Sequence, residues 1–547
     1  MMRIVACSIE PCIHNAGIFN FLNIAERLGY EAIFLGTSLS LDELLLRIEE
    51  YKPDLVGISF RLTPEVAKGI FSRLKEEIQS KNISSRFILG ATPSVAKVAE
   101  EFGIFDAIFT GGESPVEVVA YLKGEGVIRR ISYPQDLLER IEANRPYPIL
   151  RHHFGLPSLE DTIRGVSEIA EAKVLDVISI APDQNAQESF FRSEEMKEEL
   201  AGAGGVPIRK REDLEKIYEA SRTGNLPLLR CYSGTRDLIK WAELLQETIR
   251  NAWAAIPLCW YSVLDRRSNR SLVEAIRENQ MAMRWHAERG IPVEVNEAHQ
   301  WALRDAPDVV TVASAFLAGY NAKAMGVKHY IAQLMLNTPP STSGKADLGK
   351  MLAILELLSS LEDEDFKVYR QIRTGLASLS SDMSVAKGQL ASSIQLGLTL
   401  SPHIVHVVGF SEGDHSATSS EVIESCKIAQ GVIRNFLLGF PNLLADEEVI
   451  ARKNHLVREA KILLSAIKSL GVSDRDPLID PEVIAKAIKI GLLDAPHLKG
   501  NPSACGEVKT RIINGGCEAV DDKGSPIKEE ERVVKLLEDY AKVYFGL

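Results

Sequence analysis

Residues 3–17, RIVACSIEPCIHNAG, decide the first part of the fold. The apolar run RIVACSI, residues 3–9, has the length of one buried strand, and the apolar spacing from Ile18 to Leu28 is typical of a helix. Between them lies a polar loop with a cysteine, a histidine and a glycine. In a parallel sheet this loop would lie at the carboxyl end of its strand, where ligands bind. The stretch therefore predicts a ligand site beside the first strand.

The same alternation continues to about residue 125. Further strands are expected at EAIFLG (31–36), DLVGIS (54–59), RFILG (86–90) and DAIFTGG (106–112), each followed by an amphipathic helix. Five strands that are each followed by a helix indicate a parallel sheet with helices on both faces. We therefore predict a flavodoxin-like (Rossmann-like) α/β domain over residues 1–125.

A second alternation with longer units follows. Residues 126–160, with charge, proline and the stretch RHHFG (151–155), are interpreted as a linker. Seven candidate strands come next: VLDVISIA (174–181), LPLLRCY (226–232), IPLCWYSV (256–263), PVEVNE (292–297), HYIAQLML (329–336), KVYRQIR (367–373) and IVHVVGF (404–410). Seven visible strand–helix units predict a (β/α)8 TIM-type barrel over residues 161–440 with one unit hidden, and an open doubly wound sheet is the alternative. Residues 441–547 are expected to form a helical and loop-rich region that packs on the barrel.

Composition limits the kind of protein. The chain has 547 residues, a formal net charge of −12 and seven cysteines without a CxxC pair. The acidic balance argues against nucleic acid or an anionic membrane as a partner, and the cysteine pattern indicates reduced thiols. No signal peptide or membrane span is found. We expect a cytoplasmic enzyme with a small-molecule substrate, and a homodimer remains an open alternative.

The loop after the first strand carries a motif. The stretch from Cys12 through His14 to Gly17 resembles the Asp-x-His-x-x-Gly signature of cobalamin-binding domains, in which the histidine ligates cobalt from below. Ser59 and Arg61 stand where that family has Ser-x-Leu. The resemblance implies a bound cobalamin, with His14 as the ligand of its cobalt. Imidazole is a good ligand for such a metal.

The resemblance extends to the later strand ends. It implies that the cofactor is contacted by Cys12, His14, Gly17, Ser59, Arg61, Gly90, Ala91, Gly111 and Gly112. Three departures are visible: Cys12 replaces the aspartate that orients the histidine, Arg61 replaces the leucine of Ser-x-Leu, and Gly90-Ala91 replaces Gly-Gly. A thiol would control the basicity of the imidazole less well than a carboxylate. The alternative is a flavodoxin-like domain in which His14 is an ordinary loop histidine.

Three stretches of the second domain resemble the barrel subunit of glutamate mutase (methylaspartate mutase), an adenosylcobalamin-dependent isomerase. RCYSGT (230–235) resembles Arg-His-Gly-Thr, VNEAH (295–299) resembles Asn-Arg-Glu-Pro-Phe, and VHVVGFSEGDHSAT (405–418) lies over a third motif. The resemblance implies that Arg230 binds a substrate carboxylate, that Glu297 with His299 binds or exchanges a proton with the substrate, and that Glu412 contacts the ribose of the adenosyl group. Because DRRSNR (265–270) follows a predicted strand, we expect Arg266, Arg267 or Arg270 to supply a further guanidinium.

Again the chain departs from the family. The family's lysine in the third stretch falls on Val408, and no arginine lies between Pro182 and Glu188. Loss of part of an arginine clamp removes bidentate carboxylate recognition there, so glutamate itself is not carried over as substrate. Structural alternatives stay open: Arg230 in a barrel salt bridge, Glu297 with His299 as a solvated pair, and the acidic loop around Glu412 as a solvated turn or a metal site.

Together these features predict a carbon-skeleton mutase that rearranges a small carboxylic or amino acid by a 5′-deoxyadenosyl radical mechanism. The radical chemistry would belong to the cofactor, and the protein would bind the acid and exclude water. Two other functions remain open. One is a corrinoid-dependent methyltransferase, and the other is a non-catalytic cobalamin carrier or sensor with a degenerate barrel.

Overall fold

The N-terminal sheet has the strand order β2-β1-β3-β4-β5, all parallel. In this computed structural model, which describes residues 2–111, 113, 115–124, 133–472 and 474–545, the strands are β1 (Arg3–Ile9), β2 (Glu31–Leu39), β3 (Leu55–Phe60), β4 (Arg86–Ala91) and β5 (Ala107–Phe109). This order is that of the flavodoxin-like fold, so the prediction for the first domain is confirmed.

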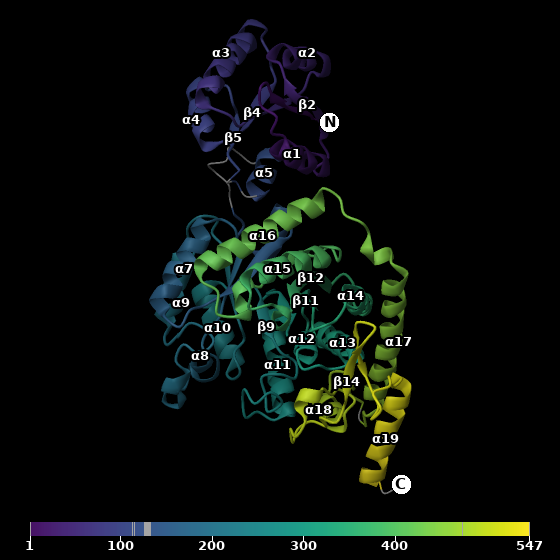
Figure 1. Ribbon diagram of the computed structural model, residues 1–547. Helices are drawn as coiled ribbons and strands as arrows, with labels where there is room; N and C mark the ends of the chain where they lie inside the picture. Colours follow the sequence, from purple (N-terminus) through teal and green to yellow (C-terminus); the bar gives the residue numbers. More distant parts are fainter. Residues whose placement is uncertain (1, 112, 114, 125–132, 473, 546–547) are drawn as a thin grey trace. The chain divides into compact units, whose positions relative to one another are not determined.

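Helices cover both faces of this sheet. They are α1 (Ala16–Arg27), α2 (Leu41–Tyr51), α3 (Pro64–Ser80), α4 (Pro93–Phe102) and α5 (Pro115–Leu122). The apolar residues of α2, α3 and α4 pack on one face around Phe71, and α1 contacts α5 on the other (Figure 1). The residues of β1 and β3 are almost wholly buried, which explains why these two strands are continuous apolar runs in the sequence.

An eight-stranded parallel sheet follows, with the order β8-β7-β6-β13-β12-β11-β10-β9. Its strands are β6 (Ile149–Phe154), β7 (Val177–Ile180), β8 (Leu228–Cys231), β9 (Ala254–Ile256), β10 (Val293–Val295), β11 (His329–Leu336), β12 (Lys367–Thr374) and β13 (Ile404–His406). Two backbone hydrogen bonds join the two end strands: Ala252 donates to Leu229 at 2.9 Å, and Ser233 donates to Ala255 at 3.2 Å. The sheet therefore curls into a nearly closed (β/α)8 barrel, as predicted.

The hidden barrel strand is β6. It lies inside residues 126–160, so the linker prediction is wrong for this segment, which pairs with both β13 and β7. Helix α6 (Leu137–Asn144) also falls within the predicted linker. A second correction concerns residues 256–263: β9 ends at Ile256, and the rest of that apolar run forms a buried loop.

Each barrel strand is followed by at least one helix. These helices are α7 (Leu159–Glu171), α8 (Gln184–Ser189), α9 (Arg211–Ala220), α10 (Leu238–Ile249), α11 (Leu272–Ala287), α12 (Ala298–Ala302), α13 (Asp308–Ala324), α14 (Gly344–Ser359), α15 (Met383–Leu398) and α16 (Ser419–Leu437). From α7 through α9, α10, α11 and α13 to α14, each long helix contacts the next around the strands (Figure 1). The fold thus directs the loops after the strands to one end of the barrel.

The remaining chain packs against the barrel helices. It contains α17 (Glu447–Ser469), α18 (Pro481–Ile490), the hairpin β14 (Thr510–Ile513) with β15 (Gly516–Ala519), and α19 (Glu529–Phe545). Helix α17 lies against α13 and α14. Short 3-10 helices include η5 (Phe410–Gly413), which follows β13. The two units of the chain meet in sequence near residue 147.

The cysteines and the apolar character of the helices can be compared with what the composition indicates. All seven cysteines are free thiols, and six of them are buried, which agrees with the expected reduced state. Among the described residues, no helix has both the length and the apolar character needed to cross a bilayer.

Candidate functional site

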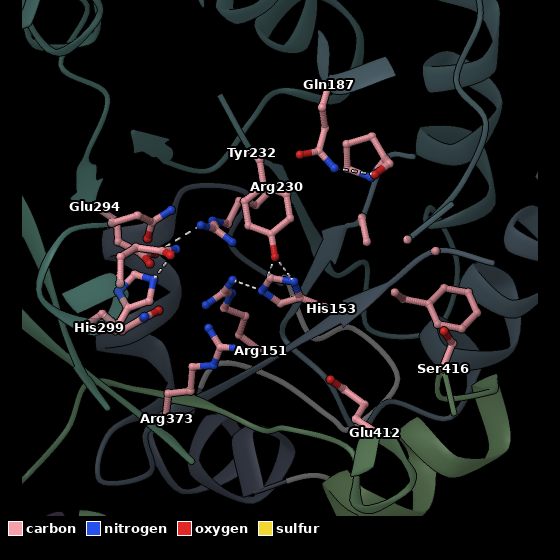
Figure 2. A pocket seen from close by; sticks show the side chains of 18 of the residues that line it. Arg151, His153, Gln187, Arg230, Tyr232, Glu294, His299, Arg373, Glu412 and Ser416 are labelled. Atoms are coloured by element: carbon pink, nitrogen blue, oxygen red, sulfur yellow. Dashed lines mark hydrogen bonds and ion pairs between the residues drawn. The ribbon is translucent and has the colours of Figure 1, made fainter. Parts of the chain in front are cut away.

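A cavity of about 460 Å³ opens at the carboxyl ends of the barrel strands. Figure 2 shows the side chains that line it. The charged and polar lining comprises Arg151, His153, Gln187, Arg230, Tyr232, Tyr261, Arg267, Glu294, Asn296, His299, Gln300, Gln333, Arg373, Glu412, His415 and Ser416. Four guanidinium groups face two carboxylates, so the lining has a surplus of positive charge. A barrel interior is normally filled by branched apolar side chains, and this polar lining indicates a site for a polar ligand.

Arg151 on β6 organises the floor of the cavity. Its Nε donates to Ser179 Oγ at 2.7 Å, its Nη1 donates to Gln371 Oε1 at 3.1 Å and to His406 Nδ1 at 2.9 Å, and its Nη2 donates to His153. These bonds use four of the five guanidinium N–H groups. Arg151 therefore serves mainly to hold its neighbours in place.

Arg230 on β8 forms a buried ion pair with Glu294 on β10. The Nη2–Oε2 distance is 3.3 Å, and both side chains are 1% exposed. Trp253 Nε1 also donates to Glu294 Oε2 at 2.8 Å. Burial opposes ionisation of Glu294, but the nearby guanidinium groups outweigh it and leave its pKa below the usual value. Among the described residues, the buried atoms Arg230 Nε and Glu294 Oε1 have no hydrogen-bond partner, so the ion pair does not use all of its hydrogen-bonding capacity.

Arg373, near the end of β12, differs from Arg151 and Arg230 in its partners. In the part of the chain that the structure describes, its guanidinium has no hydrogen bond and no ion-pair partner, and its Nε is buried. Burial lowers its pKa and the carboxylates of Glu412 and Glu294 oppose that shift, but a guanidinium stays cationic in a protein. An unpaired cation facing a polar cavity points to an anionic ligand.

Two imidazoles of the cavity, those of His153 and His299, are neutral, as is the imidazole of His406 behind His153. Burial, together with the surrounding guanidinium groups, lowers the pKa of His299 to about 3 and holds the pKa values of His153 and His406 well below their usual range. His299 Nε2 lies 3.3 Å from Gln300 Nε2. These histidines therefore add hydrogen-bonding capacity without adding charge.

The structure brings some of the predicted barrel residues together and leaves others out. Arg230, Arg267, His299 and Glu412 all line the cavity. Glu297 does not, because its carboxylate accepts the backbone N–H groups of Leu258 and Cys259, each at 3.0 Å, and Trp301 Nε1 at 2.9 Å.

Arg266 is also absent from the lining and is exposed. Its neighbour Arg267 lies 3.5 Å from Asp265 and stacks over the Tyr261 ring. Glu412 accepts from the Gly409 N–H at 3.1 Å and lies 3.4 Å from His152 Nε2.

Sequence reasoning missed Arg151, His153, Glu294 and Arg373. Alternation along a barrel strand is the signal that could have found them, since residues two apart point to the same side. Cross-strand register places Arg373 beside His406 and His406 beside Arg151 in one row. His153, Ser179 and Arg230 form the next row.

The metal alternative for the acidic loop finds no support in geometry. Among the described residues, no group of three or more histidine, cysteine, aspartate or glutamate side chains is arranged to hold a metal ion. His415 instead lies 2.9 Å from Asp414 and 3.0 Å from Glu421, and these bonds raise its pKa.

The N-terminal domain has its own site, at the loop between β1 and α1. His14 is exposed, and its Nδ1 lies 3.5 Å from the buried Cys12 Sγ. Cys12 Sγ also accepts the Arg61 N–H at 3.4 Å, and Ser59 Oγ donates to the His14 carbonyl at 2.7 Å. No described residue hydrogen-bonds to His14 Nε2. The loop is fixed by β3 while one imidazole nitrogen faces outward.

Comparison with known proteins identifies this domain. Its residues match the family model described as the B12 binding domain over residues 2–120. Residues 2–120 form a B12-binding domain.

Two solved structures are similar to this chain. One is a novel cobalamin-binding protein from Desulfitobacterium hafniense DCB-2, with 24% identity over 20% of this chain and 52% of that chain, at a TM-score of 0.18. The matched region thus spans about half the length of that protein. The other is the cobalamin-dependent S-adenosylmethionine radical enzyme OxsB, with 12% identity over all of this chain and 81% of that chain, also at a TM-score of 0.18.

The carboxyl edge of the B12-binding domain has room for a flat macrocycle. A Cβ added at Gly17 or Gly111 would meet no atom within 4 Å, and one at Gly90 would meet only the Ile58 carbonyl at 3.9 Å. Internal packing therefore does not require glycine at these three positions, although the φ of +90° at Gly111 favours glycine there for backbone reasons. Gly112 lies outside the described residues.

Apolar side chains surround the same edge. Ile13 is 66% exposed in the loop after β1, and Phe19 on α1 is 43% exposed. Leu62 and Val66, which follow β3, are also exposed, as is the side chain of Arg61. Ala91, at the end of β4, is buried. Exposed apolar side chains beside uncovered glycines suit contact with a flat ring, and the exposed His14 imidazole suits a cobalt ion.

Proposed function

We propose that this chain is an adenosylcobalamin-dependent mutase that rearranges the carbon skeleton of a small carboxylic or amino acid. The observation that carries this proposal is the unpaired Arg373 in a polar cavity at the strand ends of a barrel, in a chain that also has a B12-binding domain. Arg373 supplies an anion site, and the cofactor supplies the chemistry that such an acid would undergo.

His14 is the proposed ligand to cobalt, through Nε2. An imidazole that binds a metal through Nε2 carries its proton on Nδ1 and donates it to the nearest acceptor, here Cys12 Sγ. Ser59 fixes the backbone of the loop from the opposite side. Gly17, Gly90 and Gly111 would border the cofactor.

Arg373 and Arg230 are the proposed ligands of the substrate carboxylate. Both line the cavity with Gln333, and in the described part of the chain their Nε atoms and Gln333 Nε2 have no hydrogen-bond partner. Glu294 also lines the cavity, and its Oε1 has no partner among those residues, which suits a hydroxyl or amine of the acid. Glu412 is the proposed contact to the adenosine ribose. Glu297 and Arg266 do not line the cavity and are left out of the proposed binding set.

Adenosylcobalamin would supply a carbon-centred radical by homolysis of its cobalt–carbon bond. The chain's own residues bind the acid through Arg373 and hold His299 neutral beside it. A cavity whose donors are already oriented loses little energy to reorganisation when charge shifts in the substrate.

Electron paramagnetic resonance tests this function. The full chain is loaded with adenosylcobalamin under anaerobic conditions and mixed with propionate, succinate or L-glutamate. We expect a coupled cob(II)alamin–radical signal that depends on the acid and is lost in Arg373→Met. Methyl transfer from methylcobalamin without such a signal would favour the methyltransferase, and bound cobalamin with no reaction at all would favour the carrier.

A further inference from the structure

Three side chains of the cavity wall form a hydrogen-bonded chain. Arg151 Nη2 contacts Nε2 of His153, and the Tyr232 hydroxyl contacts the same imidazole from the other side (Figure 2). The hydroxyl oxygen lies 3.1 Å from Nε2 and closer still to Nδ1. Tyr232 follows β8 directly and lines the cavity.

The chemistry of arginine fixes the tautomer of His153. A guanidinium carries only donors, so Nε2 of His153 must accept from Arg151. A neutral imidazole with Nε2 as acceptor carries its proton on Nδ1. Burial and the positive charge of Arg151 hold the pKa of His153 well below its usual range, which keeps the ring neutral. His153 therefore donates through Nδ1–H to the Tyr232 oxygen.

The neighbouring imidazole keeps this arrangement in place. His406 stacks on His153 with ring centroids 4.6 Å apart and an angle of 11° between the planes. Arg151 donates to His406 Nδ1 at 2.9 Å, so one guanidinium orients both rings. If His153 turned over, it would lose its bond to Arg151, and a buried N–H of that cation would then lack an acceptor.

The hydroxyl proton of Tyr232 is left for the cavity. Its oxygen already accepts from His153 Nδ1–H, and the one lone pair of Nε2, 3.1 Å away, is used by Arg151. No other described residue accepts from its O–H. The Arg230 guanidinium lies 5.4 Å from the ring centroid and is itself a donor. Trp241 Nε1 donates to the Tyr232 carbonyl at 2.7 Å and holds the backbone.

We propose that Tyr232 donates a hydrogen bond to an oxygen of the acid bound in the cavity, and that Arg151 and His153 orient this hydroxyl. The inference rests on the proposed function only in taking that acid as the ligand. Tyr232 selects a hydrogen-bond acceptor at this point of the cavity and disfavours an ammonium group there. His153 and Arg151 are positioning residues, because they act through Tyr232.

Calorimetric titration of the full chain without cobalamin tests the proposal. The probes are propionate, succinate and L-glutamate, each added separately. Tyr232→Phe removes only the hydroxyl, and we expect the tightest of the three acids to bind about 10- to 100-fold more weakly. Tyr330→Phe removes the hydroxyl of a buried barrel tyrosine outside the cavity and should bind that acid as the unaltered chain does.

Variants of His153 test its part in orienting Tyr232. The amide of His153→Gln can accept from Arg151 and donate to Tyr232, so this variant should keep most of the affinity. His153→Leu can do neither and should resemble Tyr232→Phe. A double variant, Tyr232→Phe with His153→Leu, should be no weaker than either single variant, because both remove the same bond.

The outcomes separate this inference from the proposed function. Unchanged affinity in Tyr232→Phe overturns the inference and leaves the mutase proposal standing. Weakened binding without any radical signal from the loaded chain supports the inference and counts against the mutase. If the unaltered chain binds none of the three acids, both the inference and the acid class of substrate are wrong.

Discussion

Arg373 is distinct among the cavity arginines because its charge is not used by the protein itself. Arg151 distributes its donors among four side chains, and Arg230 shares its charge with Glu294. Arg373 has no such partner among the described residues. Keeping an unpaired cation in a half-buried cavity costs stability, and a bound anion would offset that cost.

The first prediction concerns this residue. Arg373→Met removes the cation and keeps much of its length, so the affinity for a small acid should fall about 10- to 100-fold in calorimetric titration, the effect of losing a charge-assisted hydrogen bond. The barrel should become no less stable, because no internal ion pair is broken. Arg164→Met, on the exposed surface of α7, is the matched control and should bind as before. Equal affinities in both variants would contradict the anion site.

The second prediction concerns His14. The absorption spectrum of bound cobalamin should change in His14→Ala toward that of a cofactor without an imidazole ligand. Cys12→Ala keeps the histidine and removes only the sulfur 3.5 Å from Nδ1, so its spectrum should lie closer to that of the unaltered chain. Identical spectra for His14→Ala and the unaltered chain would rule out ligation by this residue.

At the scale of elements, the C-terminal hairpin is tied to the barrel through a buried charge network. Asp308 on α13 lies 3.2 Å from Lys350 on α14 and 2.7 Å from Arg452 on α17, and it accepts the Cys517 N–H of β15 at 3.2 Å. Lys350 and Asp308 are each 1% exposed. One carboxylate thus joins three elements that are far apart in sequence.

The third prediction follows from that network. Asp308→Ala removes the carboxylate that Lys350 and Arg452 share. Because each cation then loses an ion-pair partner, the free energy of unfolding should fall by about 3–5 kcal/mol. Urea unfolding followed by tryptophan fluorescence measures this, since all five tryptophans, Trp241 to Trp301, lie in the barrel. Asp363→Ala breaks an exposed pair with Lys323 and should have a far smaller effect. A midpoint unchanged by Asp308→Ala would show that the network does not stabilise the barrel.

Strands with continuous apolar runs could be predicted from the sequence, whereas a strand whose buried side chains are polar could not. All five strands of the B12-binding domain and most barrel strands have the apolar runs that buried parallel strands require. Strand β6, ILRHHF, was assigned to a linker because Arg151, His152 and His153 look solvent-exposed in sequence, although all three are enclosed by the barrel.

The misplaced carboxylate has a similar cause. Glu294 and Glu297 are three residues apart, and the family resemblance pointed to Glu297. Strand β10 ends at Val295, so Glu294 still faces the barrel interior while Glu297 begins helix α12 and turns to the loop after β9. A match between short sequence motifs does not show at which residue a strand ends. In contrast, the sequence placed the His14 loop directly after the first strand, and the structure has it between β1 and α1.

At the scale of the whole molecule, buried neutral histidines link barrel stability to pH. Burial lowers the pKa of His286 to about 4 and that of His299 to about 3. Below pH 6.5 the unfolded chain binds protons at these histidines, but the folded barrel does not. The folded state therefore loses stability as pH falls from 6.5 toward 4.

The fourth prediction states this dependence as a slope. Between pH 6 and 5 each of the two histidines should lower the free energy of unfolding by roughly 1.4 kcal/mol per pH unit. Urea unfolding at each pH, followed by tryptophan fluorescence, gives the change in the free energy of unfolding per pH unit. His286→Gln should reduce this change by the contribution of one histidine. A stability that stays flat from pH 7 to 5 would mean that these imidazoles are protonated in the folded barrel.

The central claim is that a cobalamin-derived radical removes hydrogen from an acid bound by Arg373. Isotope transfer tests it most directly: the full chain is loaded with adenosylcobalamin deuterated at C5′, incubated with each acid that binds, and the acid is analysed by mass spectrometry. The account predicts deuterium in at least one acid, and none in that acid with Arg373→Met. A loaded chain that binds an acid and transfers no deuterium to it would contradict the account.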